Sequence, residues 1–306
     1  MIYTVTLNPS VDLLVTIEDL NKGKLNRMSG DAKIPGGKAV NVSRALKHLE
    51  IPSTATGFVG GFTGQYIKDW FDAKDIINEF TWVKEDTRIN IKLLESDEET
   101  IINGLGPKIR IDEFNDFLYR MSRVREGDFV IMGGSIPVNA PKEIYERLVS
   151  ICRSNGAHFV LDIPAEHMKK NLPSRPLLIS PTVELLNEMF EKVSSSLEDI
   201  IEMSKKCIEL GAKNVLVPLD DLGGALMVTE YGVFRSLPIA GEVVNTLSAK
   251  DAMLAAWMGT YMKRNDEVEA FRIASAALSA ATLVEDLPSK EEVRKIAEKV
   301  VVEELR

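Results

Sequence analysis

Residues 129–137 read Phe-Val-Ile-Met-Gly-Gly-Ser-Ile-Pro, an unbroken apolar run that is followed at once by two glycines. A strand that is apolar at every position, rather than at every second one, is usually covered on both faces. Similar apolar runs occur at 159–161, 177–179 and 215–217, and a further β-rich run occurs at 54–59. These runs predict a sheet that is buried between two layers of helices.

Segments with a helical repeat of apolar residues lie between these strands. Val42, Ala45, Leu46 and Leu49 recur at i, i+3, i+4 and i+7, which is the spacing of one face of an amphipathic helix. The segment 114–121 shows the same spacing. Strands that alternate with helices indicate an α/β fold with a mainly parallel sheet.

Two segments, approximately 11–34 and 86–104, break this alternation. Each contains half-exposed strand patterns without an intervening helix, and we expect them to form a small appended β-sheet. Two interpretations of this sheet are open, namely an edge extension of the main sheet and a lid over a site. No linker divides the chain, so residues 1–306 are expected to form a single domain.

The charge and the apolar pattern exclude several classes of protein. The 306 residues include 37 Lys and Arg against 46 Asp and Glu, which gives a formal net charge of −9. Such a surface repels phosphate backbones, so nucleic-acid binding is not expected, and an anionic ligand has to be met by local basic residues. The start of the chain reads as a strand rather than a signal peptide, and the most apolar helical segment, 273–284, is too short to span a membrane. We therefore expect a cytoplasmic protein with no membrane partner.

A glycine pair stands directly before a predicted helix, in the segment Pro-Gly-Gly-Lys-Ala-Val-Asn at 35–41. Glycines let a ligand approach the backbone, a helix N-terminus favours an anion, and Lys38 adds a full charge. The segment is not a Walker loop, because Ala32 and Ala39 stand where that motif requires glycine and serine or threonine. The pattern is compatible with a phosphate site and with a plain strand-to-helix turn.

Three further residues are candidates for a site. Asp12 and Asp251 are the candidate acids, and Asp251 lies at the start of a helical run, where an aspartate serves either as a cap or in catalysis. Ser135 follows the buried strand 129–132, and ligands of open α/β sheets bind at the carboxyl ends of strands.

Taken together, these segments resemble the ribokinase-like sugar kinases, in the branch of the 1-phosphofructokinases and tagatose-6-phosphate kinases. The resemblance covers nearly the whole chain, in order, at 3–12, 25–27, 36–44, 86–90, 103–107 and 134–137. It implies a three-layer α/β/α sandwich with a small β-sheet lid. It also implies transfer of a phosphoryl group from ATP, with Mg²⁺, to fructose 1-phosphate or tagatose 6-phosphate, which gives the bisphosphate. Relatives often dimerise through the lid, so a homodimer is compatible with the resemblance.

The same resemblance implies a role for each candidate residue. Asp251 is the expected general base. The residues expected to hold the sugar hydroxyls and the phosphate already on the sugar are Asp12, Arg27, Gly37, Lys38, Asn41, Arg88, Asn90 and Ser135. The residues expected on the ATP side are Thr182, Leu219, Gly223, Ser248, Ala249 and Lys250, and Glu184 is the candidate acid for magnesium-bound water.

The ATP side departs from the family pattern at three places. Residues 248–251 read Ser-Ala-Lys-Asp instead of Gly-Ala/Ser-Gly-Asp, residues 182–185 replace Asn-x-x-Glu, and residues 218–224 form a longer turn with two extra carboxylates. Glycines in such a loop allow backbone angles that other residues disfavour. Two explanations are open. Either Lys250 replaces the lost backbone contacts in a working kinase, or the protein binds a sugar phosphate as a sensor or partner subunit without turnover.

Overall fold

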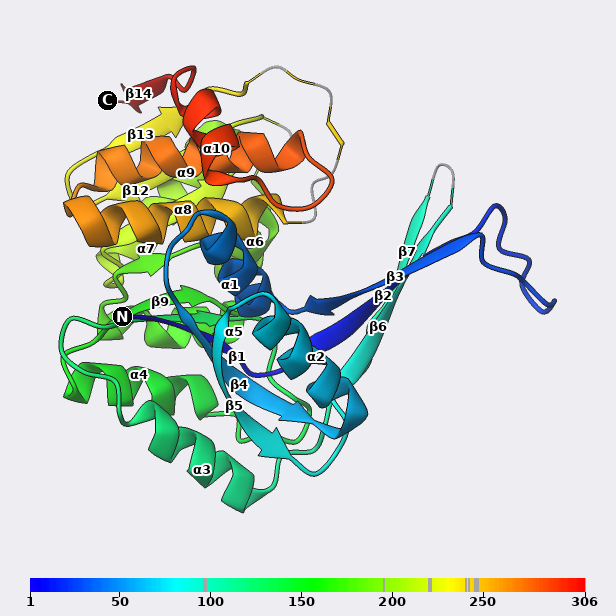
Figure 1. Cartoon of the computed structure of the whole chain (residues 1–306). Coiled ribbons are helices and arrows are strands. Elements are labelled where there is room, and N and C mark those ends of the chain that lie inside the picture. The colour runs from blue at the N-terminus through cyan, green and yellow to red at the C-terminus, as the bar shows by residue number, and fades with distance from the viewer. Residues whose placement is uncertain are drawn as a thin grey trace.

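The computed structural model describes residues 1–95, 98–194, 196–219, 222–239, 241, 243–244 and 248–305. The strands of its main sheet are β1 (Ile2–Thr6), β4 (Thr54–Gly60), β5 (Ile77–Val83), β8 (Phe129–Gly133), β9 (His158–Asp162), β10 (Leu178–Ile179), β11 (Asn214–Pro218), β12 (Ala225–Thr229), β13 (Val233–Ser236) and β14 (Val302–Leu305). Their order across the sheet is β14-β13-β12-β11-β10-β9-β8-β1-β4-β5 (Figure 1).

Neighbouring strands from β11 to β5 run parallel. β1 lies between β4 and β8, and the parallel pairing continues through β9 and β10 to β11. The last three strands, β12 to β14, add to one edge as antiparallel pairs. The predicted mainly parallel α/β sheet is therefore confirmed.

Helices cover both faces of this sheet (Figure 1). One face carries α1 (Lys38–His48), α2 (Gly61–Ala73), α8 (Ala249–Arg264), α9 (Glu267–Thr282) and α10 (Lys290–Ala297). The other carries α3 (Ile111–Met121), α4 (Ile144–Ser154), α5 (Ala165–Asn171) with a 3-10 turn (Leu172–Ser174), α6 (Val183–Phe190) and α7 (Leu197–Glu209). Along β8, Val130 and Met132 pack into the second layer, whereas Phe129 and Ile131 pack into the first. This explains why residues 129–132 are apolar at every position.

The small appended sheet consists of β2 (Ser10–Thr16), β3 (Gly30–Gly36), β6 (Arg88–Leu94) and β7 (Glu99–Ile102), in the order β3-β2-β6-β7. It is hydrogen-bonded as a sheet of its own and projects away from the helical layers (Figure 1). The interpretation as an edge extension of the main sheet is therefore wrong. The pairing β2–β6 is parallel and joins segments far apart in the sequence, which a local pattern does not specify.

The helix α8 is packed between other elements along most of its length. Its residues from Asp251 to Gly259 are all buried, and Trp257 is among the largest fully buried side chains. A helix surrounded in this way is held in one position, so a side chain in its first turn is placed precisely. None of the helices in the described part of the chain has the length and the apolar character needed to cross a bilayer.

Candidate active site

One cavity of about 510 Å³ lies where the carboxyl ends of β1, β8 and β9 face the small sheet. Most of the predicted site residues line it, namely Asp12, Gly37, Lys38, Asn41, Arg88, Asn90, Ser135, Thr182, Lys250 and Asp251. Parallel strands end at the same edge of a sheet, and ligands of α/β proteins bind there. The fold thus brings together residues whose proximity the sequence only implied by resemblance.

The other predicted site residues do not line this cavity. Arg27 is exposed in the segment between β2 and β3, and Glu184 is exposed on α6. Ser248 and Ala249 are buried beside the cavity at the start of α8, and Leu219 and Gly223 belong to the turn between β11 and β12. The two extra carboxylates of that turn, Asp220 and Asp221, and residues 245–247 lie outside the described residues.

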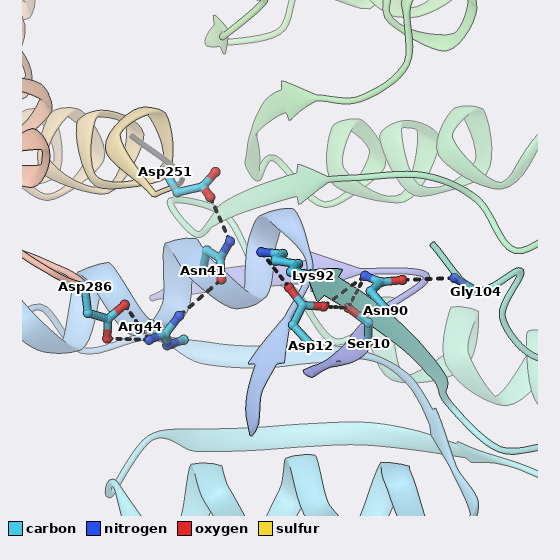
Figure 2. Close-up of polar contacts among 9 residues, drawn as sticks. All are labelled: Ser10, Asp12, Asn41, Arg44, Asn90, Lys92, Gly104, Asp251 and Asp286. Carbon is cyan, nitrogen blue, oxygen red and sulfur yellow. Dashed lines mark hydrogen bonds and ion pairs between the residues drawn. The ribbon is translucent and has the colours of Figure 1, made fainter. Parts of the chain in front are cut away.

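The carboxylate of Asp12 is held on both of its oxygens (Figure 2). Its Oδ1 accepts hydrogen bonds from Ser10 Oγ at 2.6 Å and Asn90 Nδ2 at 2.9 Å, and its Oδ2 lies 3.1 Å from Lys92 Nζ. The Oδ1 of Asn90 in turn accepts from the backbone N–H of Gly104 at 3.2 Å. These contacts fix a buried carboxylate on the side of the cavity that the small sheet forms.

The glycine pair before α1 has a structural reason at each position. A Cβ on Gly36 would lie 2.3 Å from Oδ1 of Asp12, so a side chain there would displace this carboxylate. Gly37 has φ of +117° and a Cβ there would lie 2.9 Å from Thr6 Cγ2, a backbone angle and a space that favour glycine. Close approach to Asp12 and the chain reversal into α1 therefore both require glycine.

Besides Lys250 on α8, three cationic side chains line the cavity, and they come from two elements. Lys38 comes from the first turn of α1, and Arg88 and Lys92 come from β6. Arg88 Nη1 donates to the carbonyl of Gly104 at 3.2 Å, and its buried Nε has no hydrogen-bond partner among the described residues. This cluster is the local basic patch that an acidic chain needs if it binds an anionic ligand.

Asp251 lies in the first turn of α8 and is only 3% exposed. Its Oδ2 accepts a hydrogen bond from Asn41 Nδ2 at 3.0 Å, whereas its buried Oδ1 has no partner among the described residues (Figure 2). Burial raises the pKa of Asp251 to about 6, against the opposing charge of Lys38 and with a further rise from Asp162. A carboxylate with this pKa is ionised at neutral pH and binds a proton more readily than an exposed aspartate, which suits a general base.

Lys250 forms a buried ion pair with Asp162, at 2.6 Å between Nζ and Oδ1. Lys38 Nζ lies 3.8 Å from the other oxygen of the same carboxylate. Burial opposes the ionisation of Asp162, but the charges of Lys250 and Lys38 outweigh it and lower its pKa below the usual range. The lysine that replaces a glycine in the 248–251 loop is thus neutralised by the carboxylate at the end of β9.

Sequence reasoning missed two charged residues of the cavity, Asp162 and Lys92. Asp162 could have been found because it is the last residue of the buried strand β9, as Gly133 is of β8, two residues before Ser135. Lys92 could have been found from the alternation of β6, because residues two apart share a face of a strand, as Arg88, Asn90 and Lys92 do. In both cases the signal was present in the sequence.

The residues at the cavity fit Mg²⁺ only as an ion that is carried mainly by the phosphates of a nucleotide. Within the described ranges, no group of three or more His, Cys, Asp or Glu side chains is arranged to hold a metal ion. Asp162 is occupied by Lys250, and Glu184 does not reach the cavity. Mg²⁺ commonly keeps several waters and binds substrate phosphates with one or two protein carboxylates.

The chain matches known proteins over its whole length. A model of the pfkB family carbohydrate kinases matches residues 5–289. The chain is 42% identical to a 1-phosphofructokinase of Bacillus subtilis over 305 residues, which is 100% of each chain. It is 33% identical to a D-tagatose-1-phosphate kinase of Bacillus licheniformis over 306 residues, again 100% of each chain.

The fold is also found among solved structures. Phosphofructokinase-2 from Escherichia coli in complex with fructose-6-phosphate superposes with a TM-score of 0.91 at 25% identity, over 97% of this chain and 98% of that one. The resemblance inferred from the sequence segments is confirmed by the family match and by these relatives. The chain belongs to the pfkB family of carbohydrate kinases.

Proposed function

We propose that this protein is an ATP-dependent kinase that phosphorylates fructose 1-phosphate on its free primary hydroxyl, with tagatose 6-phosphate as a second acceptor. The observation that carries the proposal is that a buried carboxylate, Asp251, and the cations Lys38, Arg88 and Lys92 line one cavity. A sugar that already bears a phosphate has the charge to meet these cations. Two relatives named as kinases of fructose and tagatose phosphates support this substrate class.

The residues of the cavity divide the work of binding an acceptor. Arg88 and Lys38 hold the phosphate already on the sugar, since guanidinium and ammonium groups form charge-assisted hydrogen bonds to phosphate oxygens. Asp12, Asn90 and the backbone of Gly37 form hydrogen bonds to the sugar hydroxyls. Asn41 and Ser135 complete the lining of the cavity around the sugar. Asp251 accepts the proton of the attacking hydroxyl through its free Oδ1, so that the oxygen forms its bond to phosphorus as the bond to ADP breaks.

The donor side is formed by the start of α8. The first N–H groups of a helix have no acceptor within the helix and favour an anion, and Lys250, whose charge is paired with Asp162, lies at this point. Ser248 and Ala249 contribute backbone atoms to this site. Thr182, Leu219 and Gly223 are the residues that we expect to contact the nucleotide. Mg²⁺, when bound with ATP, neutralises the charge of the donor phosphates.

The first test is the acceptor dependence of ADP release in a coupled assay with Mg-ATP. We expect ADP release with fructose 1-phosphate and with tagatose 6-phosphate. With unphosphorylated fructose, kcat/KM should be lower by about 10²-fold or more, because the hydrogen bonds to the phosphate are then lost. Calorimetric titration with each ligand separates binding from turnover. Binding of fructose 1-phosphate without binding of ATP or release of ADP would contradict the proposal and favour a sensor or partner subunit.

We also propose that two copies meet through the face of the small sheet that points away from the cavity. Leu13 pairs with Ile91, and Ile91 pairs with Ile102, so these apolar side chains share one face of the projecting strands. We expect light scattering to give twice the mass of one chain, 34.0 kDa, and Ile91→Lys to give one chain mass. Val301→Lys, at an exposed apolar residue of the main body, is the control. A wild-type protein with the mass of one chain would contradict this assembly.

A further inference from the structure

A buried arginine lies behind the catalytic carboxylate and has no place in the proposed chemistry. Arg44, on α1, is 3% exposed, and its Nη2 donates to both carboxylate oxygens of Asp286 at 2.8 and 2.5 Å (Figure 2). Its Nη1 donates to Oδ1 of Asn41 at 3.4 Å. Asp286 is in the segment between α9 and α10, and neither Arg44 nor Asp286 lines the cavity.

The contact with Arg44 determines which end of the Asn41 amide faces Asp251. An asparagine side chain has one end that donates and one that accepts, whereas a guanidinium group only donates. Arg44 therefore selects the Oδ1 end, which leaves Nδ2 to donate to Oδ2 of Asp251. In the reversed orientation, an amide oxygen would face a carboxylate oxygen and an NH₂ group would face the guanidinium, and both contacts are repulsive.

We propose that Arg44 and Asp286 are positioning residues, which fix the orientation of the Asn41 amide and thereby hold Asp251 with its free Oδ1 towards the cavity. The ion pair with Asp286 uses the Nη2 end of the guanidinium, so the Nη1 end is aimed at Asn41. Arg44 also lies over the ring of Trp70, at 5.4 Å from the ring centroid, which restricts its movement further. This inference rests on the proposed role of Asp251 as the base.

The effect of this chain of contacts can be separated from the other charges near Asp251. The charged groups that face Asp251 are Lys38 on α1, Asp162 at the end of β9 and Lys250 on α8. All three remain in a variant of Asp286. Asp286→Asn leaves the positive charge of Arg44 without its partner, which by itself lowers the pKa of Asp251, so a rise of that pKa reports on a weaker hydrogen bond from Asn41.

The experiment titrates Asp251 directly, in full-length protein labelled with ¹³C at the aspartate carboxyl groups and assigned by Asp251→Asn. We expect Asp286→Asn and Arg44→Lys to raise the pKa of Asp251 by about one unit, a tenfold change in proton affinity, because the hydrogen bond that favours the ionised form is weakened. In the same variants, the acidic limb of kcat should move to higher pH, so that kcat falls about twofold at pH 7 and about tenfold well below pH 6, and the KM for ATP should be unchanged.

Two further variants serve as controls. Asp286→Glu keeps a carboxylate for Arg44 and should restore the wild-type titration. Glu50→Gln removes a neighbouring exposed ion pair with Lys290, 2.6 Å long, and should leave Asp251 unaffected. If Asp286→Asn and Arg44→Lys unfold more easily but Asp251 titrates as in the wild type, Arg44 and Asp286 are structural residues and the inference is wrong. The titration needs no turnover, so a failure of the kinase assay leaves this test intact.

Discussion

Replacement of Asp251 by asparagine lowers the kcat for ADP formation by about 10²–10⁴-fold, which is the usual contribution of a positioned general base. Asparagine has nearly the same shape, and its amide still has an oxygen for Asn41, but it does not accept the proton of the attacking hydroxyl. The affinity for fructose 1-phosphate should remain near that of the wild type, because the cations proposed to hold the phosphate are unchanged. A coupled assay and calorimetry on the same protein measure the two quantities.

The control for this variant lies at the other end of the cavity. Asp12→Asn weakens the contacts proposed for the sugar, so it should raise the KM for the sugar phosphate more than it lowers kcat.

The wild-type kcat should also fall as the pH drops through about 6, since Asp251 is protonated below its raised pKa and no longer accepts a proton. Use of kcat at saturating substrate avoids the ionisation of the free sugar phosphate. An Asp251→Asn rate equal to the wild-type rate would refute its role as base.

Replacement of Lys250 by methionine destabilises the fold by about 3–5 kcal/mol, because it leaves the buried carboxylate of Asp162 without its nearest counter-charge. Because Lys38 lies 3.8 Å from Asp162 and still attracts its carboxylate, we expect a loss of stability towards the lower end of this range. Urea unfolding measures the difference. The double variant Lys250→Met/Asp162→Leu should recover much of the loss, since it removes the stranded charge as well.

A surface pair of the same chemical type provides the matched control. Lys170 and Glu166 lie 2.5 Å apart with side chains that are 52% and 71% exposed, so Lys170→Met should destabilise the fold far less than Lys250→Met. The pH dependence of the Lys250 effect also has a definite sign. The lowered pKa of Asp162 contributes stability above its unfolded pKa of about 3.9, and this is lost as the pH falls through the lower folded value. Equal losses of stability in Lys250→Met and Lys170→Met would contradict the role given to the buried pair of Lys250 and Asp162.

The main sheet could be predicted from the sequence because the apolar pattern that specifies its strands is local. A strand covered on both faces has to be apolar at every position, so residues 129–132 and 215–217 indicate a buried parallel sheet without reference to any partner. The small sheet was less predictable, since the pairing of β2 with β6 is between distant segments. Its separation from the main sheet depends on those long-range hydrogen bonds.

The candidate site was predictable where glycine or charge stands in a recognisable segment. Gly37 and Lys38 belong to a segment that resembles the family, Asp251 ends the loop that departs from it, and the structure places all three at one cavity. Arg27 stands in a similar segment, yet the structure places it on an exposed connection away from the cavity. A motif specifies residue types, but the path of the backbone decides which of them meet.

The sequence by itself determined the α/β class and the family, and it predicted the residue types of the site, because periodicity, glycine positions and residue types can be read from local segments. The tertiary structure alone decided how the charges are paired. Lys250 meets Asp162 across 88 positions, Asn41 meets Asp251 across 210, and Arg44 meets Asp286 across 242. No local pattern encodes such contacts, since they exist only when the layers of the sheet and helices have packed. They set the proton affinity of Asp251 and the charge at the start of α8, on which the proposed phosphoryl transfer depends.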